Sequence, residues 1–463
     1  MSLIKSISGI RGTIGGKPGT SLTPIDVVKF TAAYGALIQG QNKGNKIIIG
    51  RDGRISGAMV RSLVTATLQG MGFEVIDLGL STTPTVEMAV KMEQAAGGII
   101  LTASHNPKEW NALKLLNAAG EFISAEEGAA VLARAEQEDI TFADVNKLGT
   151  ITEDDSFMQR HIDAILAHPL VDAEAIRSRK FKIAVDAVNS TGATFVPALL
   201  RALGVEDIAV LNEEVNGHFA HNPEPLPENL RELCSFVEKK NYDMGIAVDP
   251  DVDRLCFVNE DGSLFGEEYT LVAVADYILS NNKGNTVSNL SSTRALRDVT
   301  EKHGGTYHPS AVGEVNVVKK MKEVNAVIGG EGNGGIIDPE LHYGRDALVG
   351  IGLFLTHLAK FGKSIKALRR TYPDYFISKN KIELGEEVDV QKIFEKIKAK
   401  YARQPINTED GVKIEFDKDW VHLRTSNTEP IIRIYSESNS ETTAQNIAKR
   451  IMEDIKELMS ERN

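Results

Sequence analysis

The sequence lacks the features that mark several large classes of protein. It has two cysteines, Cys234 and Cys256, far apart and in no CxxC pair, so neither a disulfide framework nor a thiolate metal site is expected. No run approaches the roughly 18 consecutive apolar residues of a membrane span. The first residues also lack the apolar segment of a secretory signal. These absences predict an intracellular, cytoplasmic protein with no membrane partner.

Excess positive charge is absent too. The 52 Lys and Arg against 64 Asp and Glu give a net charge of −12, which argues against a nucleic-acid partner, since such binding needs a basic surface. The pattern GxxxxGK[ST] is missing, which disfavours an ordinary P-loop kinase. What is present is a 42% apolar chain of 463 residues, enough for packed cores. At about 150 residues per domain, roughly three domains are expected, with two or four also compatible.

Strand-like and helix-like runs alternate over most of the chain and recur in the same order, which predicts an α/β fold. The strand-like runs lie at 46–51, 72–79 and 98–101, then at 182–188, 204–212 and 245–248, and more weakly at 286–290, 305–308 and 326–328. A period of about 140 residues favours triplicated α/β domains over a solenoid, whose repeats are about 20–50 residues long. The alternative is that ordinary α/β patterning looks repetitive.

The pattern changes after about residue 373. Segments 412–416 and 420–424 alternate like antiparallel strands, 431–435 is a further strand, and a last helix has Ile447, Ile451, Ile455 and Leu458 on one face. This predicts a smaller α+β domain at the C-terminus. The predicted domains are therefore 1–152, 153–256, 257–371 and 372–463.

The third strand of each repeat runs into a polar or glycine-rich loop. These loops are 102–107 (TASHNP), 249–254 (DPDVDR) and 329–335 (GGEGNGG). In open α/β sheets, ligands bind at the carboxyl ends of the strands. We therefore expect the three loops to meet at one cleft.

Asp249, Asp251 and Asp253 alternate in a stretch too irregular for simple sheet. Three carboxylates this close repel one another unless a cation neutralises them, and hard oxygen ligands suit Mg²⁺ or Mn²⁺. An EF-hand is the rival interpretation, because Glu260 falls at the last position of such a loop. However, Arg254 stands where its sharp turn needs glycine. A solvated acidic turn is the structural alternative.

Ser104 lies just past a strand and before Pro107, which has no N–H and biases Asn106 away from helix. A hydroxyl there is a candidate nucleophile or phosphate carrier, with His105 as its neighbour. Helix capping is the ordinary alternative. Lys114 is an available cation nearby, although an isolated lysine most often lies on the surface.

A third cluster of donors lies near the C-terminus. Segment 424–428 (RTSNT), with Arg433, offers side-chain and loop N–H donors for a phosphate or carboxylate clamp, and a polar hairpin is the alternative. Arg51 and Arg54 are either phosphate contacts or ordinary salt-bridge partners of Asp52.

Taken in order, the loops TASHNP, DPDVDR, GEGNGG and RTSNTEPIIR resemble those of the α-D-phosphohexomutases, over essentially the whole chain. The resemblance implies an α/β fold of three similar domains with mixed sheets, plus a smaller α+β C-terminal domain, all around a central cleft. It implies an enzyme that interconverts 6-phospho and 1-phospho sugars through a phosphoserine and a bisphosphate intermediate. It also implies one Mg²⁺ per subunit and a sugar 1,6-bisphosphate as activator.

The resemblance assigns a role to each loop. Ser104 is implied as the phosphorylated serine and, with the three aspartates, as a metal ligand. Arg11 and Lys114 fall where the family places residues proposed to assist proton transfer, and His105 is grouped with them. The residues implied to bind substrate are Arg254, Glu331, Asn333, Arg424, Ser426, Asn427, Thr428 and Arg433. Family members often have serine where Asn333 stands, so this sugar loop is atypical.

The resemblance favours phosphoglucosamine mutase, because the GGEGNGG loop looks like that of archaeal-type members. Phosphomannomutase and phosphoglucomutase are the alternatives. A metal-dependent phosphosugar phosphatase is a different class, disfavoured because the ten histidines do not cluster in sequence with the aspartates. A non-catalytic phosphosugar-binding protein would not need the acidic loop beside a serine. We expect a monomer or homodimer whose partner is a small phosphosugar.

Overall fold

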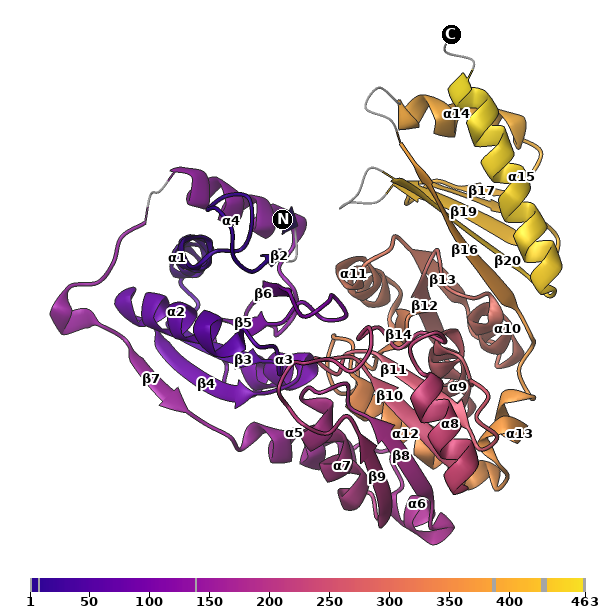
Figure 1. The fold of residues 1–463 in the computed structure, drawn as a ribbon, viewed down its shortest axis with the longest axis horizontal. Helices are drawn as coiled ribbons and strands as arrows, with labels where there is room; N and C mark the ends of the chain where they lie inside the picture. Colours follow the sequence, from indigo (N-terminus) through magenta and orange to yellow (C-terminus); the bar gives the residue numbers. More distant parts are fainter. Residues whose placement is uncertain (1, 7–8, 138–139, 385–388, 426–430, 461–463) are drawn as a thin grey trace.

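The computed structural model describes residues 2–6, 9–137, 140–384, 389–425 and 431–460 (Figure 1). The chain forms four sheet-centred units in sequence order. The N-terminal unit lies at the left of the view and the C-terminal unit at the upper right. Among the described residues, no helix has the length and apolar character needed to cross a membrane.

The first unit is built on a seven-stranded sheet in the order β1-β2-β6-β5-β3-β4-β7. Its strands are β1 (Leu3–Ser6), β2 (Gly9–Thr13), β3 (Lys46–Arg51), β4 (Glu74–Leu80), β5 (Gly97–Leu101), β6 (Trp110–Leu116) and β7 (Thr150–Glu153). Its helical segments are α1 (Pro24–Gln41), α2 (Gly57–Gly70), α3 (Thr83–Met92), α4 (Ala125–Gln137) and the short 3₁₀ turn η1 (Val145–Lys147). Helix α1 begins with a capping box on Thr23 and a proline at its first position, which fix where the helix starts.

The second and third units have four-stranded sheets, β11-β10-β8-β9 and β15-β14-β12-β13. Their strands are β8 (Lys182–Asp186), β9 (Asp207–Leu211), β10 (Met244–Val248), β11 (Leu255–Asn259), β12 (Asn285–Asn289), β13 (Tyr307–Ser310), β14 (Ala326–Glu331) and β15 (Gly335–Ile337). Their helices are α5 (Phe157–Leu166), α6 (Ala173–Arg179), α7 (Gly192–Ala202), α8 (Arg231–Lys240), α9 (Glu267–Asn281), α10 (Ala295–Lys302), α11 (Glu314–Val324), α12 (Ala347–Phe361) and α13 (Ile365–Arg369).

The first three sheets share a four-stranded core of the same topology, which confirms the predicted repeat. In each, the first strand of the repeat pairs in parallel with the second and third, and a fourth strand returns antiparallel beside the third. Because the third strand ends at its hairpin, the loops after β5, β10 and β14 occupy equivalent positions in the three units.

The second and third units are not separately packed. One cluster of buried side chains runs through both, and Phe257 of β11 stacks on Phe354 of α12 with ring centroids 3.8 Å apart. The predicted boundary after residue 256 falls inside β11, which pairs with β10. The second sheet therefore extends to Asn259. The other domain limits stay predictions.

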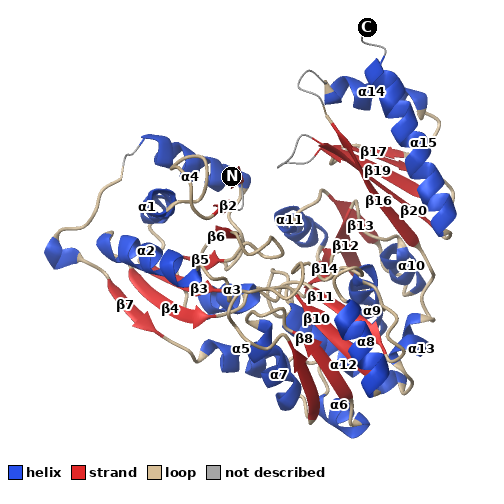
Figure 2. Cartoon of the chain, viewed as in Figure 1, coloured by secondary structure: helices blue, strands red, loops and turns tan. Residues whose placement is uncertain are grey.

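The C-terminal unit is an antiparallel sheet in the order β16-β20-β19-β18-β17, with its two helices along one side (Figure 2). Its elements are β16 (Phe376–Glu383), β17 (Ile406–Asn407), β18 (Val412–Glu415), β19 (Trp420–Thr425), β20 (Ile431–Ser438), α14 (Val390–Lys400) and α15 (Glu441–Ser460). Ile451 and Ile455 of α15 are buried in its core, as the helical spacing predicts.

Candidate active site

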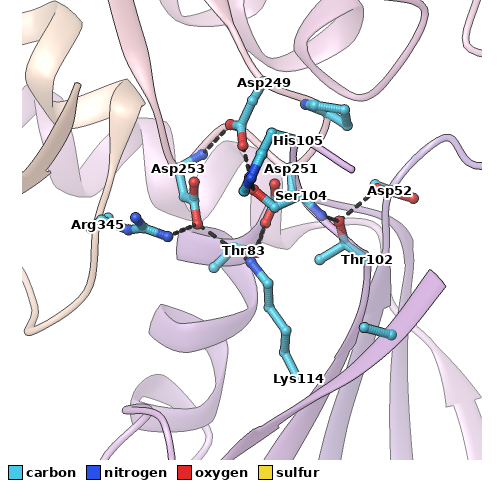
Figure 3. A network of polar contacts seen from close by, with 12 residues as sticks. Asp52, Thr83, Thr102, Ser104, His105, Lys114, Asp249, Asp251, Asp253 and Arg345 are labelled. Atoms are coloured by element: carbon cyan, nitrogen blue, oxygen red, sulfur yellow. Dashed lines mark hydrogen bonds and ion pairs between the residues drawn. The ribbon is translucent and has the colours of Figure 1, made fainter. Parts of the chain in front are cut away.

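Ser104 sits directly after β5 in a strained backbone conformation, with φ of +49°. Left-handed backbone at a residue other than glycine costs free energy and persists only where the surroundings hold it. Here the Ser104 N–H donates to Thr102 Oγ1 at 2.9 Å, and Thr102 in turn donates to Asp52 at 2.6 Å. The Ser104 side chain points out of the loop and donates to Asp249 Oδ2 at 2.7 Å (Figure 3).

The buried Arg54 fixes the conformation of the loop that contains Ser104. Its side chain is fully buried, and Nε lies 3.0 Å from Asp52 Oδ2. The guanidinium also donates to four backbone carbonyls of the loop, those of Ser104, Asn106, Pro107 and Trp110. Of the two alternatives left open by the sequence, the salt bridge is therefore right for Arg54, and its function is to shape the loop.

Replacing Arg54 by methionine is expected to lower the free energy of unfolding by about 3–5 kcal/mol, because it leaves the buried Asp52 carboxylate without its counter-charge. Denaturant titration followed by circular dichroism measures this. Arg177→Met is the matched control, because that arginine is exposed and pairs with Glu174 at the surface; we expect a change within about 0.5 kcal/mol. Equal effects of the two substitutions would contradict the assignment.

The three aspartates of the loop after β10 form a compact acidic cluster. Each is completely buried, and one oxygen from each lies within 4.8 Å of the others. Asp249 Oδ1 accepts the backbone N–H groups of Asp253 and Arg254, both at 3.1 Å. Among the described residues, Asp251 Oδ1 and Asp253 Oδ1 have no hydrogen-bond partner. Burial excludes a solvated turn, and Glu260 accepts from the Lys366 N–H instead of closing an EF-hand loop.

Cations and a hydroxyl surround the cluster. Lys114 Nζ lies 2.6 Å from Asp251 Oδ2 and 3.4 Å from Asp253 Oδ2, and Thr83 donates to Asp251 at 2.5 Å. Burial and the two neighbouring aspartates raise the pKa of Asp249 well above its usual value. Burial opposes the ionisation of Asp253 as well, but Arg345 and Lys114 outweigh it and lower that pKa. On the Asp249 side, next to Ser104, Arg254 Nε lies 4.0 Å from Asp249 Oδ2, and it offsets the burial of Asp249 only in part.

The loop after β14 presents Glu331, whose carboxylate is fixed on both oxygens. Oε1 accepts from Asn289 Nδ2 at 2.8 Å and from the Gly313 N–H at 3.1 Å, and Oε2 accepts from Arg345 Nη1 at 2.8 Å. Asn333 Oδ1 accepts the Gly335 N–H at 3.2 Å, which tightens the turn. Sequence reasoning missed Arg345, since an arginine in a helix-start segment gives no signal of its contacts.

One cavity of about 690 Å³ joins the loops of all four units. The predicted residues on its wall are Arg11, His105, Arg254, Glu331, Asn333, Arg424 and Arg433. Burial, with Arg254 and Arg11 nearby, lowers the pKa of His105 well below its usual value, so its imidazole is neutral at pH 7. Further wall residues that sequence reasoning missed are Asn289, Glu224, Glu268, Arg345 and Lys379.

The C-terminal unit contributes a pair of arginines. Arg424 on β19 stands directly opposite Arg433 on β20, and its Nε lies 3.2 Å from Asp410. Two guanidinium groups side by side at a cavity wall favour a doubly charged anion. The predicted residues Ser426, Asn427 and Thr428 of the same clamp lie outside the described residues.

Comparison with known families agrees with this geometry. Models of the three alpha/beta/alpha domains of phosphoglucomutase/phosphomannomutase match residues 3–141, 159–262 and 266–375, and the model of its C-terminal domain matches 381–454. The acidic cluster lies beside Ser104, and Arg424 and Arg433 lie on the wall of the cavity that the four units share. The chain belongs to the phosphoglucomutase/phosphomannomutase family and is a phosphohexomutase, an enzyme of the isomerase class.

Relatives of known name extend over nearly the whole chain. A phosphoglucomutase/phosphomannomutase of Thermococcus kodakarensis is 36% identical, covering 94% of this chain and 95% of the relative. A phosphoglucosamine/phosphogalactosamine mutase of Sulfurisphaera tokodaii is 31% identical, covering 97% and 98%. The crystal structure of a phosphoglucomutase/phosphomannomutase family protein of Burkholderia thailandensis is similar, with a TM-score of 0.85 at 25% identity. The match covers 97% of this chain and 96% of that one.

Proposed function

We propose that the protein interconverts glucosamine 6-phosphate and glucosamine 1-phosphate by way of a phosphoryl group carried on Ser104. The observation that supports this most directly is the 2.7 Å contact between the Ser104 hydroxyl and the buried Asp249, beside the shared cavity. A serine held in strained backbone next to an acidic cluster, beside a cavity lined by two arginines, is suited to phosphoryl transfer.

The acidic cluster fits one Mg²⁺ per subunit. Two buried carboxylate oxygens, of Asp251 and Asp253, are without partners among the described residues, and hard oxygen donors are what this ion takes. Asp249, Asp251, Asp253 and the phosphorylated Ser104 would hold it. When bound, the ion supplies positive charge that offsets the charge on the transferring phosphoryl group.

The chain's own residues account for the remaining chemistry. The bond from phosphorus to Ser104 Oγ breaks as a bond to a sugar hydroxyl oxygen forms, which produces a sugar bisphosphate and frees the serine. The bisphosphate then turns over in the cavity and returns its other phosphoryl group to Ser104. In each transfer the proton of the attacking hydroxyl ends on the departing oxygen, and we assign this proton transfer to Arg11, His105 and Lys114. His105 Nδ1 lies 3.4 Å from Ser104 Oγ, and Lys114 Nζ lies 2.6 Å from Asp251 Oδ2.

Arg424 and Arg433 are proposed to grip whichever phosphate is not reacting. Arg424→Ala is expected to raise KM about tenfold or more, because each charge-assisted hydrogen bond contributes about 1.5–3 kcal/mol. It should lower kcat less, since the clamp binds ground state and transition state alike. A weaker grip lets more bisphosphate escape, so activity should depend more on added sugar 1,6-bisphosphate. Unchanged KM together with unchanged activator dependence would refute the clamp.

The choice of sugar rests on relatives. Several relatives near 30% identity are named phosphoglucosamine mutases. Phosphoglucomutase or phosphomannomutase activity is the second candidate, supported by the relative of that name at 36% identity. Comparing kcat/KM for glucosamine, glucose and mannose 6-phosphates tests this. A preference for glucose or mannose would overturn the choice of glucosamine.

A further inference from the structure

Arg345 contacts three carboxylates that come from three different segments. Nη2 lies 2.7 Å from Asp253 Oδ2 of the acidic cluster, Nη1 lies 2.8 Å from Glu331 Oε2 of the sugar loop, and Nε lies 3.0 Å from Glu314 Oε2 at the start of α11. The side chain is buried at the cavity wall. One planar guanidinium thus connects the proposed metal ligand Asp253 to the proposed sugar ligand Glu331.

The backbone brings the same two loops together around Arg345. The Ala347 N–H donates to the Val252 carbonyl at 3.2 Å, and the Leu255 N–H donates to the Gly334 carbonyl at 3.0 Å. Gly334 has φ of +85°, and a Cβ there would lie 2.3 Å from the Leu255 oxygen. The acidic loop and the sugar loop are therefore packed too closely to move independently.

The main chain of Arg345 is also fixed. The next residue, Asp346, caps α12 by accepting the Leu348 N–H at 2.8 Å. Its other oxygen lies 2.8 Å from His161 Nε2 and 3.1 Å from His342 Nε2. Arg345 is therefore held at its main chain by the start of α12 and at its guanidinium by three carboxylates. A side chain fixed in this way can set the positions of its partners.

We propose that Arg345 is a positioning residue that fixes the Glu331 carboxylate relative to Asp253, so that a sugar hydroxyl bound by Glu331 is placed correctly for the phosphoryl group on Ser104. Positioning dominates phosphoryl transfer, and a misplacement of about 1 Å costs about 10²-fold in rate. Lysine cannot replace arginine here, because its ammonium is a point charge without the fork that spans three carboxylates. The inference rests on the proposed function, in that Glu331 binds a sugar hydroxyl and Ser104 carries the phosphoryl group.

The test is a double-mutant cycle on kcat/KM with the sugar phosphate that the native enzyme turns over best. Arg345→Lys should lower kcat/KM about 100-fold. If Arg345 acts through Glu331, adding Arg345→Lys to Glu331→Gln should cost less than about threefold more. Arg369→Lys is the matched control, a partly buried arginine that donates to the Phe265 carbonyl, and it should retain native kcat/KM. Losses that multiply in the double variant would overturn the proposal.

A second readout does not depend on turnover. Isothermal titration calorimetry with EDTA present should show Arg345→Lys binding the same sugar phosphate about tenfold more weakly than the native protein, because Glu331 is no longer held. An unchanged dissociation constant would contradict the role. Should Arg345→Lys fail to fold, Gly335→Ala replaces it, since the added Cβ would lie 2.4 Å from Arg345 Cδ and displace the side chain while keeping its charge. We expect the same pattern of losses, and native values would overturn the proposal.

The two proposals fail in different ways. A native protein that converts no hexose phosphate refutes the proposed function, while calorimetry with the hexose phosphate that it binds most tightly still tests the role of Arg345. A native protein that is active while Arg345→Lys is equally active refutes the role of Arg345 alone.

Discussion

Ser104→Ala is expected to lower phosphosugar isomerisation by at least about 10³-fold, because it removes the oxygen that carries the phosphoryl group. Thermal stability should change little, since Arg54 and Thr102 still hold the loop when the hydrogen bond from the hydroxyl to Asp249 is lost. Coupled-enzyme rates measure the loss, and peptide mass spectrometry should find phosphate on Ser104 of the native protein only. Ser62→Ala, on the exposed face of α2, is the control. Native-like turnover without the Ser104 hydroxyl would refute the phosphoserine mechanism.

Asp251→Asn is expected to lower activity at least about 100-fold, because one charged oxygen donor is lost from a buried cluster of three. Saturating Mg²⁺ should restore it only in part. Native protein treated with EDTA should lose activity and regain it when Mg²⁺ is added back.

The matched control for Asp251 is Asp261→Asn, which lies in the same unit near the surface and pairs with Lys366. It should retain native rates and the native Mg²⁺ requirement. Full activity of the native protein in excess EDTA, or an Asp251→Asn enzyme indistinguishable from Asp261→Asn, would contradict the metal assignment.

The repeat could be predicted because it rests on local signals. Short apolar runs followed by polar loops mark strands and their carboxyl ends, and the structure shows the loops after β5, β10 and β14 at equivalent positions. The family resemblance, and not the repeat alone, implied that Ser104 lies beside Asp249, and the hydroxyl lies 2.7 Å from that carboxylate. Strand β11, which pairs with β10, also follows the repeat. The predicted domain boundary after residue 256 nevertheless falls inside this strand.

What escaped prediction depends on contacts between distant segments. Nothing local to Arg54 distinguishes an arginine that shapes a loop from one that binds phosphate, until its four carbonyl partners are known. Arg345 is similar, because Glu314 and Glu331 become its partners only after the third unit has folded. The second and third units also share a core, in which Phe257 stacks on Phe354. A repeat pattern could not predict this, because it describes each unit separately.

A ³¹P NMR time course tests most directly whether Ser104 returns its phosphoryl group to the sugar. The native protein is incubated with Mg²⁺, a trace of glucosamine 1,6-bisphosphate and glucosamine 6-phosphate, with glucose and mannose 6-phosphates in parallel. A mutase should convert the 6-phosphate signal of at least one sugar into its 1-phosphate signal with no growth of inorganic phosphate. Inorganic phosphate accumulating in place of the 1-phosphate would show that water is the acceptor, and would contradict the mutase mechanism proposed here.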